Sequence, residues 1–456
     1  MSKAFDYVSE NFGKFTTQLK EWVAIPSVST DPERVNAIQQ AAEWLAADMM
    51  TMGLENVEVL PTDGHPVVYG DWLHAGDDKP TILVYGHYDV QPAVVEDGWD
   101  SDPFEAVERD GILFARGATD DKGQVMIQMK AMEALLKSDA CPVNVKYLIE
   151  GEEEIGSPNL AKFVEQNKGK LSADICLISD TGVQSKEQPS LTYSLRGLMT
   201  MTLVVSGPAR DLHSGGYGGM IHNPAQAITE IIAQLHNAQG MVTVPGFYDD
   251  VLALSADERE TLAKANISEA HWQEVMGDLR EWGGSEFNRI EKIGARPTLE
   301  INGIASGYAG EGFKTVLPAR AVAKISARLV ADQNPHDIYA KVRDYILSLA
   351  PDTVNVEVLE EHHGFPALTP LDHPAVQAAV TAYETHFPNP PLLVRGGGSI
   401  PVVPEIQQIL DVPVVLLGFG LPDSQAHGPN ERFHLDQYET GIRTVITYMH
   451  EVAKTM

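Results

Sequence analysis

The hydrophobic and polar positions follow one pattern in the outer parts of the chain and another in the middle. In the outer parts, short apolar segments alternate with helical periodicities; these segments cover residues 81–86, 111–117, 143–149, 173–179 and 412–420. Short, β-rich apolar segments are typical of strands that are covered on both faces. Because such strands alternate with helices, we predict an α/β fold with a mostly parallel sheet flanked by helices.

The middle of the chain has a different order of elements. A long alternating strand is followed by a helix, two strands, a second helix and a last strand. This β-α-β-β-α-β order predicts a ferredoxin-like α+β domain. The first pattern resumes near residue 373. We therefore expect one α/β domain, formed by residues 1–190 and 369–456, that is interrupted by an inserted domain formed by residues 191–368.

Composition limits the partners that we expect. The chain has 456 residues, 43% of them hydrophobic, with a formal net charge of -31. This charge argues against nucleic acid and anionic membranes as partners, and it favours cations. The stretch MSKAFDYVSE lacks the apolar core that we expect of a signal peptide, and no apolar run is long enough for a membrane span. Cys141 and Cys176 fit buried, reduced thiols, so we expect a cytoplasmic protein.

Polar residues follow each predicted strand of the outer domain at its carboxyl end, where open α/β sheets form their ligand crevice. These positions are His87 with Asp89, Asp120 with Asp121, the acidic cluster at residues 150–154, Asp180, and a loop that holds His427. Any one of them could be a cap or a turn residue. Their occurrence at equivalent strand ends predicts that two histidines and several carboxylates converge on one site.

The residue types in this set indicate a transition-metal site. Mixed nitrogen and oxygen ligands suit zinc, manganese or cobalt, whereas calcium and magnesium sites are nearly all oxygen. Without sulfur ligands, a catalytic zinc site is favoured over a structural one. Two histidines with three or four acids exceed the needs of one ion, so we expect two ions that share a carboxylate.

The spacing of His87 and Asp89 has a mechanical meaning. Residues two apart on a strand point to the same side, so Asp89 can accept the second imidazole N–H of His87. Such a bond fixes the tautomer of a metal-binding histidine and raises its basicity.

Six motifs together resemble the di-zinc metallopeptidases of clan MH, the family of carnosinase-type dipeptidases, aminoacylases and succinyl-diaminopimelate desuccinylase. They are YGHYDVQP, ARGATDDKG, EGEEEIGS, ISDTG and AHGPNE in the outer domain, and DLHSGGYGG in the insert. They span most of the chain in the family's order. The resemblance implies a two-metal catalytic domain with an inserted lid or dimerisation domain, and zinc as the expected metal.

The resemblance also implies ligands and roles for individual residues. One metal would be bound by His87 and Asp180, the other by Glu154 and His427, with Asp120 as the bridge. The peptide between Asp120 and Asp121 is cis in relatives.

Two further residues of the outer domain match catalytic positions of the family. Glu153 matches the general base, which takes a proton from the attacking water and returns it to the leaving amine. Asp89 matches the acid that orients a metal-binding histidine.

The resemblance implies three more functional residues, two of them in the insert. His213 matches a histidine that reaches the active site of a partner subunit and holds the tetrahedral oxyanion, which implies a homodimer through this domain. Arg328 matches an arginine that binds the substrate carboxylate, and Ser399 lies in a loop that lines the substrate pocket.

Three functions remain open at this level. The long segment between residues 244 and 284 and the stretch RGGGSIPV resemble the carnosinase-type branch, so dipeptides or other small peptides are the expected substrates. Gly396 stands where carnosinase-like enzymes often carry an acid, which leaves an N-acyl amino acid deacylase as an alternative. A non-catalytic, acidic cation-binding protein is the alternative from a different class.

Overall fold

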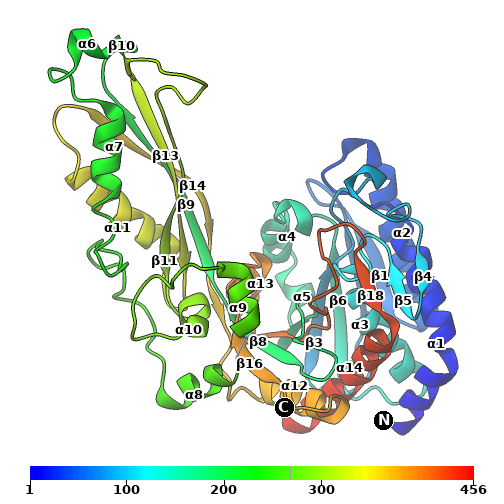
Figure 1. Cartoon of the computed structure of the whole chain (residues 1–456). Helices are drawn as coiled ribbons and strands as arrows, with labels where there is room; N and C mark the ends of the chain where they lie inside the picture. The colour runs from blue at the N-terminus through cyan, green and yellow to red at the C-terminus, as the bar shows by residue number, and fades with distance from the viewer. Residues whose placement is uncertain (266–268) are drawn as a thin grey trace. The chain divides into compact units, whose positions relative to one another are not determined.

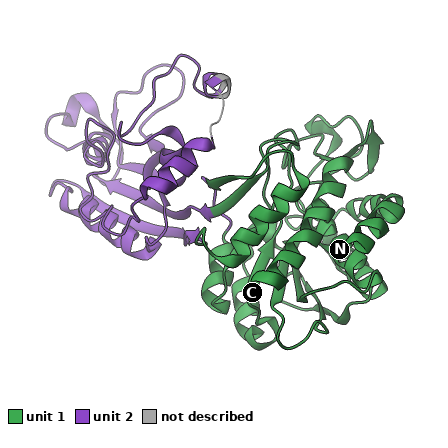
Figure 2. Ribbon diagram, turned by 90° about the horizontal axis from the view of Figure 1, so that it is seen from below, with its two compact units in different colours: residues 1–193, 369–394, 401–456 green, residues 194–368, 395–400 purple. Residues whose placement is uncertain are grey.

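The computed structural model describes residues 1–265 and 269–456, and the chain divides into two compact units. Unit 1 comprises residues 1–193, 369–394 and 401–456, and unit 2 comprises residues 194–368 and 395–400 (Figure 2). Residues 266–268, which belong to the long segment that resembles the carnosinase-type branch, lie outside the described residues.

The larger sheet has nine strands. Its order is β1 (Glu55–Leu60), β2 (Val67–Trp72), β6 (Asn144–Glu150), β3 (Thr81–His87), β7 (Ile175–Ile178), β17 (Val414–Leu416), β8 (Ser190–Leu195) and β15 (Ala367–Leu368), with β16 (Leu392–Arg395) paired to β8. The central strands β6, β3, β7 and β17 are parallel, whereas β1, β2, β8 and β15 pair antiparallel. The predicted α/β class is confirmed, with the parallel pairing concentrated at the centre of the sheet.

The helices of unit 1 form two groups, and the helices within each group contact one another (Figure 1). The first group comprises α1 (Ser2–Val23), α2 (Val35–Met52), α3 (Lys122–Lys137), α12 (Pro374–His386) and α14 (Leu435–Thr455). The second comprises α4 (Leu160–Gln166), α5 (Lys168–Leu171) and α13 (Val402–Leu410). Helix α3 is buried along almost its whole length, as a helix packed between a sheet and other helices must be. Within the described residues, no helix combines the length and the apolar character that crossing a lipid bilayer requires.

One predicted strand of the central sheet belongs to another sheet. Residues 112–114 form β5 (Ile112–Phe114), which pairs antiparallel with β4 (Val107–Arg109) and β18 (Arg432–His434) in a separate three-stranded sheet. Only three residues of the apolar segment are extended, and Leu113 pairs with Phe433 rather than with a central strand. Asp120 therefore reaches the site on a loop and not at the end of a core strand.

Unit 2 contains the predicted ferredoxin-like sheet, in the order β11 (Thr298–Ser306), β13 (Arg320–Leu329), β9 (Gly197–Ser206) and β14 (Asn355–Gly364), with every pair antiparallel. Helices α7 (Pro224–Ile232) and α11 (Pro335–Ser348) pack on it, and both begin with an asparagine cap followed by proline. Alternate residues of β9 and β13 form the core beneath them. The remaining elements are β10 (Leu212–His213) paired with β12 (Val316–Leu317), α6 (Ser214–Tyr217), α8 (Ala256–Lys264), α9 (Glu269–Met276) and α10 (Arg289–Gly294).

Candidate metal centre

The structure brings all five predicted metal ligands together in unit 1. They form two groups that share Asp120: His87, Asp120 and Asp180 in one, and Asp120, Glu154 and His427 in the other. Within each group, the ligand atoms lie within 4.8 Å of one another. His87 ends β3, and the others lie on loops or on a short 3-10 helix, Glu153–Ile155, that follows β6.

The carboxylate of Asp120 lies between the two histidines. Its Oδ1 is 3.2 Å from His87 Nε2, and its Oδ2 is 3.0 Å from His427 Nε2. Asp180 Oδ2 lies 4.0 Å from His87 Nε2, and Glu154 Oε2 lies 3.2 Å from His427 Nε2. Each oxygen of Asp120 thus faces a different set of ligand atoms, which is the geometry of a bridging carboxylate.

A buried nitrogen tests whether these residues fit a metal ion. His87 is fully buried, and its Nε2 makes no hydrogen bond within the part of the chain that the structure describes. An unpaired buried imidazole nitrogen is costly unless something else occupies its lone pair. Because it points at carboxylate oxygens from two other segments, a divalent cation satisfies both the nitrogen and the acids. The residues therefore fit the expected metal pair.

The electrostatics of the cluster also call for positive charge. Burial, together with the nearby charge of Asp120, raises the pKa of Asp180 well above its usual value. Hydrogen bonds that His427 donates to the Asp120 and Glu154 carboxylates raise the pKa of its imidazole to about 10. Both shifts favour the protonated forms, because the carboxylates of this cluster lie close together and need protons or cations to balance their charge.

Asp89 is fully buried and holds two parts of the site. Nδ1 of His87 lies 3.0 Å from the backbone carbonyl oxygen of Asp89 and 3.4 Å from its carboxylate. The two carboxylate oxygens accept the backbone N–H groups of Glu153 and Glu154, each at 3.1 Å. Asp89 therefore orients His87 and also fixes the turn that carries the acidic segment, a contact that the sequence analysis did not predict.

The four acids between residues 150 and 154 occupy different environments. The carboxylate of Glu153 reaches the ligand cluster, with Oε2 3.9 Å from His87 Nε2, and burial raises its pKa. Glu150 is buried and accepts hydrogen bonds from Tyr85 and Ser157. Glu150 is therefore not a solvated surface acid.

Glu152 is buried as well, and it connects the acidic segment to its surroundings. Its carboxylate accepts the backbone N–H of His65 at 3.0 Å and the side-chain amide of Asn159 at 2.9 Å. The carboxylate of Glu152 therefore connects neighbouring loops and does not face the ligand cluster. Glu153 is the acid of this segment that faces the cluster without belonging to either ligand group.

Sequence reasoning missed a buried carboxylate that holds the Asp120 loop. Glu431 pairs with Arg116 at 2.7 Å and accepts the backbone N–H groups of Gly117, Thr119 and Asp120 at 2.9–3.0 Å. Its signal was its place in the stretch AHGPNE, four residues after His427.

The cis peptide between Asp120 and Asp121, expected from the resemblance, is present. Asp121 is also buried, and its carboxylate accepts the backbone N–H of His87 at 3.3 Å. This contact was not predicted either.

A cavity of about 330 Å³ in unit 1 opens beside two of the ligands, Asp120 and Asp180. Its other walls include Thr181, Leu421 and Pro422. The ligand cluster therefore has space next to it for a small molecule.

The other three predicted residues, His213, Arg328 and Ser399, lie in unit 2. His213 ends β10 and is exposed, and its Nδ1 accepts the backbone N–H of Gly215 at 3.0 Å. Arg328 on β13 donates to the hydroxyl of Ser399 at 2.9 Å, and that hydroxyl donates to the backbone carbonyl of Arg196. Burial and the charge of Arg328 lower the pKa of Arg196 to about 10. The structure thus adds a second, unpredicted guanidinium beside the Arg328–Ser399 pair.

The chain is similar to known peptidases over nearly its whole length. It is 32% identical to the Cys-Gly metallodipeptidase of Schizosaccharomyces pombe, over 99% of this chain and 98% of that protein. It is also 32% identical to the human Beta-Ala-His dipeptidase, over 100% of this chain and 93% of that protein. A solved structure of an M20 family metallo-carboxypeptidase from Sulfolobus solfataricus matches with a TM-score of 0.83 and 31% identity, over 96% of this chain and 99% of that one.

The family model described as peptidase family M20/M25/M40 matches residues 83–451, a range that contains all five candidate ligands. With this match and full-length relatives at 32% identity, the chain belongs to that family and is a metallopeptidase.

Proposed function

We propose that the chain hydrolyses the peptide bond of dipeptides or other small peptides with two divalent metal ions, for which zinc is the first candidate and manganese or cobalt are alternatives. The observation that carries this proposal is the position of Asp120, whose two oxygens face different histidines at 3.2 and 3.0 Å. Two ions held by His87, Asp180, Asp120, Glu154 and His427 would supply Lewis-acid activation of a water molecule and of the scissile carbonyl.

Glu153 is the proposed general base. Its carboxylate lies at the edge of the ligand cluster, and the hydrogen bonds of Glu153 and Glu154 backbone N–H groups to Asp89 fix its direction. A raised pKa suits a group that accepts a proton from water and later gives it to the leaving amine.

Residues of unit 2 are proposed to recognise the substrate. Arg328 and Ser399, with Arg196 beside them, offer positive charge and a hydroxyl to a carboxylate. His213 is proposed to stabilise the tetrahedral oxyanion of a partner subunit, in a homodimer formed through the insert. The cytoplasmic location, the homodimer and the domain boundaries at residues 190 and 368 stay predictions.

The names of the relatives favour dipeptides, since they include a Cys-Gly metallodipeptidase and a Beta-Ala-His dipeptidase. A deacylase acting on N-acyl amino acids is the second candidate, because Gly396 offers no side chain to pair with a free substrate amino group. The non-catalytic alternative is set aside, because the chain is a metallopeptidase by family.

The test is an activity panel on metal-reconstituted protein with dipeptides, N-acyl amino acids and N-succinyl-diaminopimelate. We expect dipeptide hydrolysis that a chelator removes and added metal restores. Preference for an N-acyl amino acid would favour the deacylase, and no hydrolysis of any substrate would contradict the proposal.

The base is tested separately with Glu153→Gln. This variant should keep its metal content and lose hydrolysis by about 10²–10⁴-fold. Glu165→Gln, at an exposed position of α4, serves as the matched control and should hydrolyse like the parent. Normal turnover in Glu153→Gln would contradict the assignment.

A further inference from the structure

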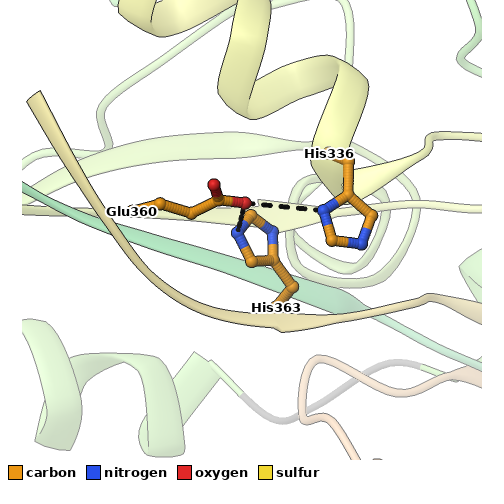
Figure 3. A group of neighbouring side chains, drawn as sticks. All are labelled: His336, Glu360 and His363. Carbon is orange, nitrogen blue, oxygen red and sulfur yellow. Dashed lines mark ion pairs between the residues drawn. The ribbon is translucent and has the colours of Figure 1, made fainter.

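A second cluster of histidines and a carboxylate lies in unit 2, outside the residues discussed so far. His336 is the second residue of α11, and Glu360 and His363 belong to β14 (Figure 3). Glu360 Oε1 lies 2.7 Å from His363 Nε2 and 3.5 Å from His336 Nδ1. One carboxylate oxygen therefore faces nitrogens of both imidazoles.

A β-bulge explains how Glu360 and His363 come to lie together. In a regular strand, residues three apart point to opposite faces. Here the register passes from Glu360 opposite Met201 to His363 opposite Met199, so β14 contains one residue more than β9 between these pairs. The extra residue turns His363 to the side of Glu360.

Hydrogen bonds between the two strands hold the bulge. The backbone N–H of His362 donates to the Thr200 hydroxyl at 2.9 Å, and that hydroxyl lies 3.4 Å from the carbonyl oxygen of His362. Val356 and Val358 lie four and two residues before Glu360 on β14, so they are on the same face of the strand as Glu360. Both valines pack against the core of unit 2. The bulge thus directs both ligand candidates to the face of the sheet on which α11 lies.

Aromatic contacts hold the two imidazoles in place. The rings of His336 and His363 are stacked, with centroids 4.5 Å apart and an interplanar angle of 25°. The ring of Tyr339 meets His363 edge-on at 5.8 Å, and the ring of Phe365 meets His336 at 6.0 Å. The side chain of His363 is 11% exposed, whereas that of His336 is 59% exposed. The cluster is packed on one side and open to solvent on the other.

The nitrogens of His363 are not used by ordinary hydrogen bonds. Both nitrogens are buried, and neither makes a hydrogen bond to another described residue, although Nε2 lies 2.7 Å from the carboxylate of Glu360. A neutral imidazole has one nitrogen with a free lone pair, which His363 can offer to an ion.

We propose that His336, Glu360 and His363 bind one divalent transition-metal ion of the zinc class. Two imidazole nitrogens and one carboxylate oxygen are a ligand set that zinc, nickel and copper accept. In a tetrahedral zinc site with bonds of about 2.0–2.2 Å, neighbouring ligand atoms lie roughly 3.3–3.5 Å apart, so the ligand atoms of this cluster need move little. The ligand atoms already lie within 4.8 Å of one another. Three protein ligands leave one position for water or an external group.

This site differs from the proposed two-metal centre in what it does to the fold. It joins the first turn of α11 to the edge strand β14, the element that follows α11 along the chain. An ion bound there ties the helix to the bulged end of the strand without using any residue of unit 1.

The experiment counts zinc ions per chain after equilibrium dialysis in buffered zinc, with the parent protein and His336→Ala. We expect the variant to bind about one zinc ion fewer per chain, since two remaining ligands hold zinc poorly. The exposed His362→Ala is the matched control, because it removes a neighbouring histidine that is not in the cluster, and it should bind as much zinc as the parent.

Diffraction at the zinc absorption edge gives the position. The proposal expects an anomalous peak bonded to His336 Nδ1 and His363 Nε2 in zinc-soaked crystals of the parent. Equal zinc content in the parent and in His336→Ala, or peaks only among the ligands of unit 1, would overturn it. If His336→Ala fails to fold, Glu360→Gln replaces it, because Glu360 is half exposed on an edge strand.

Discussion

The part of the chain that the structure describes contains two clusters of histidines and carboxylates, and their carboxylates differ in burial. In unit 1 the carboxylates of Asp120 and Asp180 are 17% and 15% exposed, whereas in unit 2 the carboxylate of Glu360 is 46% exposed. Each cluster has one largely buried and one exposed histidine, which are His87 and His427 in unit 1 and His363 and His336 in unit 2. Buried carboxylates need a cation or a proton to balance them, while exposed ones are balanced by water. The stability of the fold should therefore depend strongly on the charge balance of the cluster in unit 1, and little on that of the cluster in unit 2.

The contacts that hold the ligands in place also differ between the two clusters. In unit 1, Asp89 and Glu431 are buried carboxylates that accept backbone N–H groups next to the ligands. In unit 2, ring contacts and a β-bulge position the imidazoles. Hydrogen-bonded supports in a buried place fix a ligand to a fraction of an ångström, which catalysis requires and metal storage or bracing does not.

Removing the shared ligand should have the largest effect in the molecule. Asp120→Asn removes the charge that faces both histidines, so both metal positions should lose affinity, and hydrolysis should fall by at least about 10³-fold. Asp180→Asn, which touches one ligand group only, should weaken one position. Metal analysis and kcat/KM measure both. Loss of a single ion in Asp120→Asn would show that the carboxylate does not bridge.

Removing a support in unit 1 should destabilise the fold. In Glu431→Gln, a carboxylate that accepts from Arg116 and three backbone N–H groups is replaced by an amide with one acceptor oxygen. We expect the free energy of unfolding to fall by about 3–5 kcal/mol, measured by urea denaturation.

The matched control for that variant is Glu439→Gln, which breaks a partly exposed helical ion pair with Arg443. It should cost no more than about 0.5 kcal/mol. Equal losses in the two variants would contradict the difference in burial on which the comparison rests.

Burial of charge in unit 1 also predicts a pH dependence. Burial raises the pKa of Glu150 to about 8, against an ordinary value of 4.5. The folded state therefore holds an extra proton between these values, so the free energy of unfolding falls as the pH rises through this window.

Glu150→Gln keeps an acceptor for Tyr85 and Ser157 and removes the titration. From about pH 5.5 to about pH 7.5, the metal-stripped parent should lose about 2–3 kcal/mol more stability than this variant. Urea unfolding at the two pH values measures the difference. Parallel pH profiles of the two proteins would mean that Glu150 titrates normally.

The ligands of unit 1 and one of their supports, Asp89, could be predicted from the sequence, whereas the support Glu431 could not. His87 and Asp180 follow apolar segments, and the carboxyl ends of parallel strands meet at one edge of a sheet. Glu431 gave no such signal, because the N–H groups that it accepts lie more than 300 residues earlier in the chain. The wrong placement of residues 112–114 has the same origin: pairing with Phe433 is a long-range choice that local hydrophobicity does not encode.

The cluster of unit 2 could not be predicted from the sequence for a related reason. A histidine three residues after a glutamate on a predicted strand is expected on the opposite face. Only the pairing of β14 with β9 reveals the bulge between Glu360 and His363. The position of His336 depends in turn on how α11 packs on the sheet. Register between strands, rather than the pattern within one strand, decides this site.

The smallest expected effect is the stabilisation of the fold by zinc at the cluster of unit 2. It tests whether this cluster supports the fold only when metal is bound. An ion that binds only the folded state stabilises it by about 1.4 kcal/mol at ten times its Kd. Zinc should therefore stabilise the parent by about this much more than it stabilises His336→Ala, while the two proteins should unfold alike in chelator, because His336 is exposed and Asn334 still caps α11. Chemical denaturation of the parent, His336→Ala and the control His362→Ala, each with zinc and with chelator, provides the comparison. A loss of stability in His336→Ala that persists in chelator would show that the unit 2 cluster, like Glu431 in unit 1, supports the fold without metal.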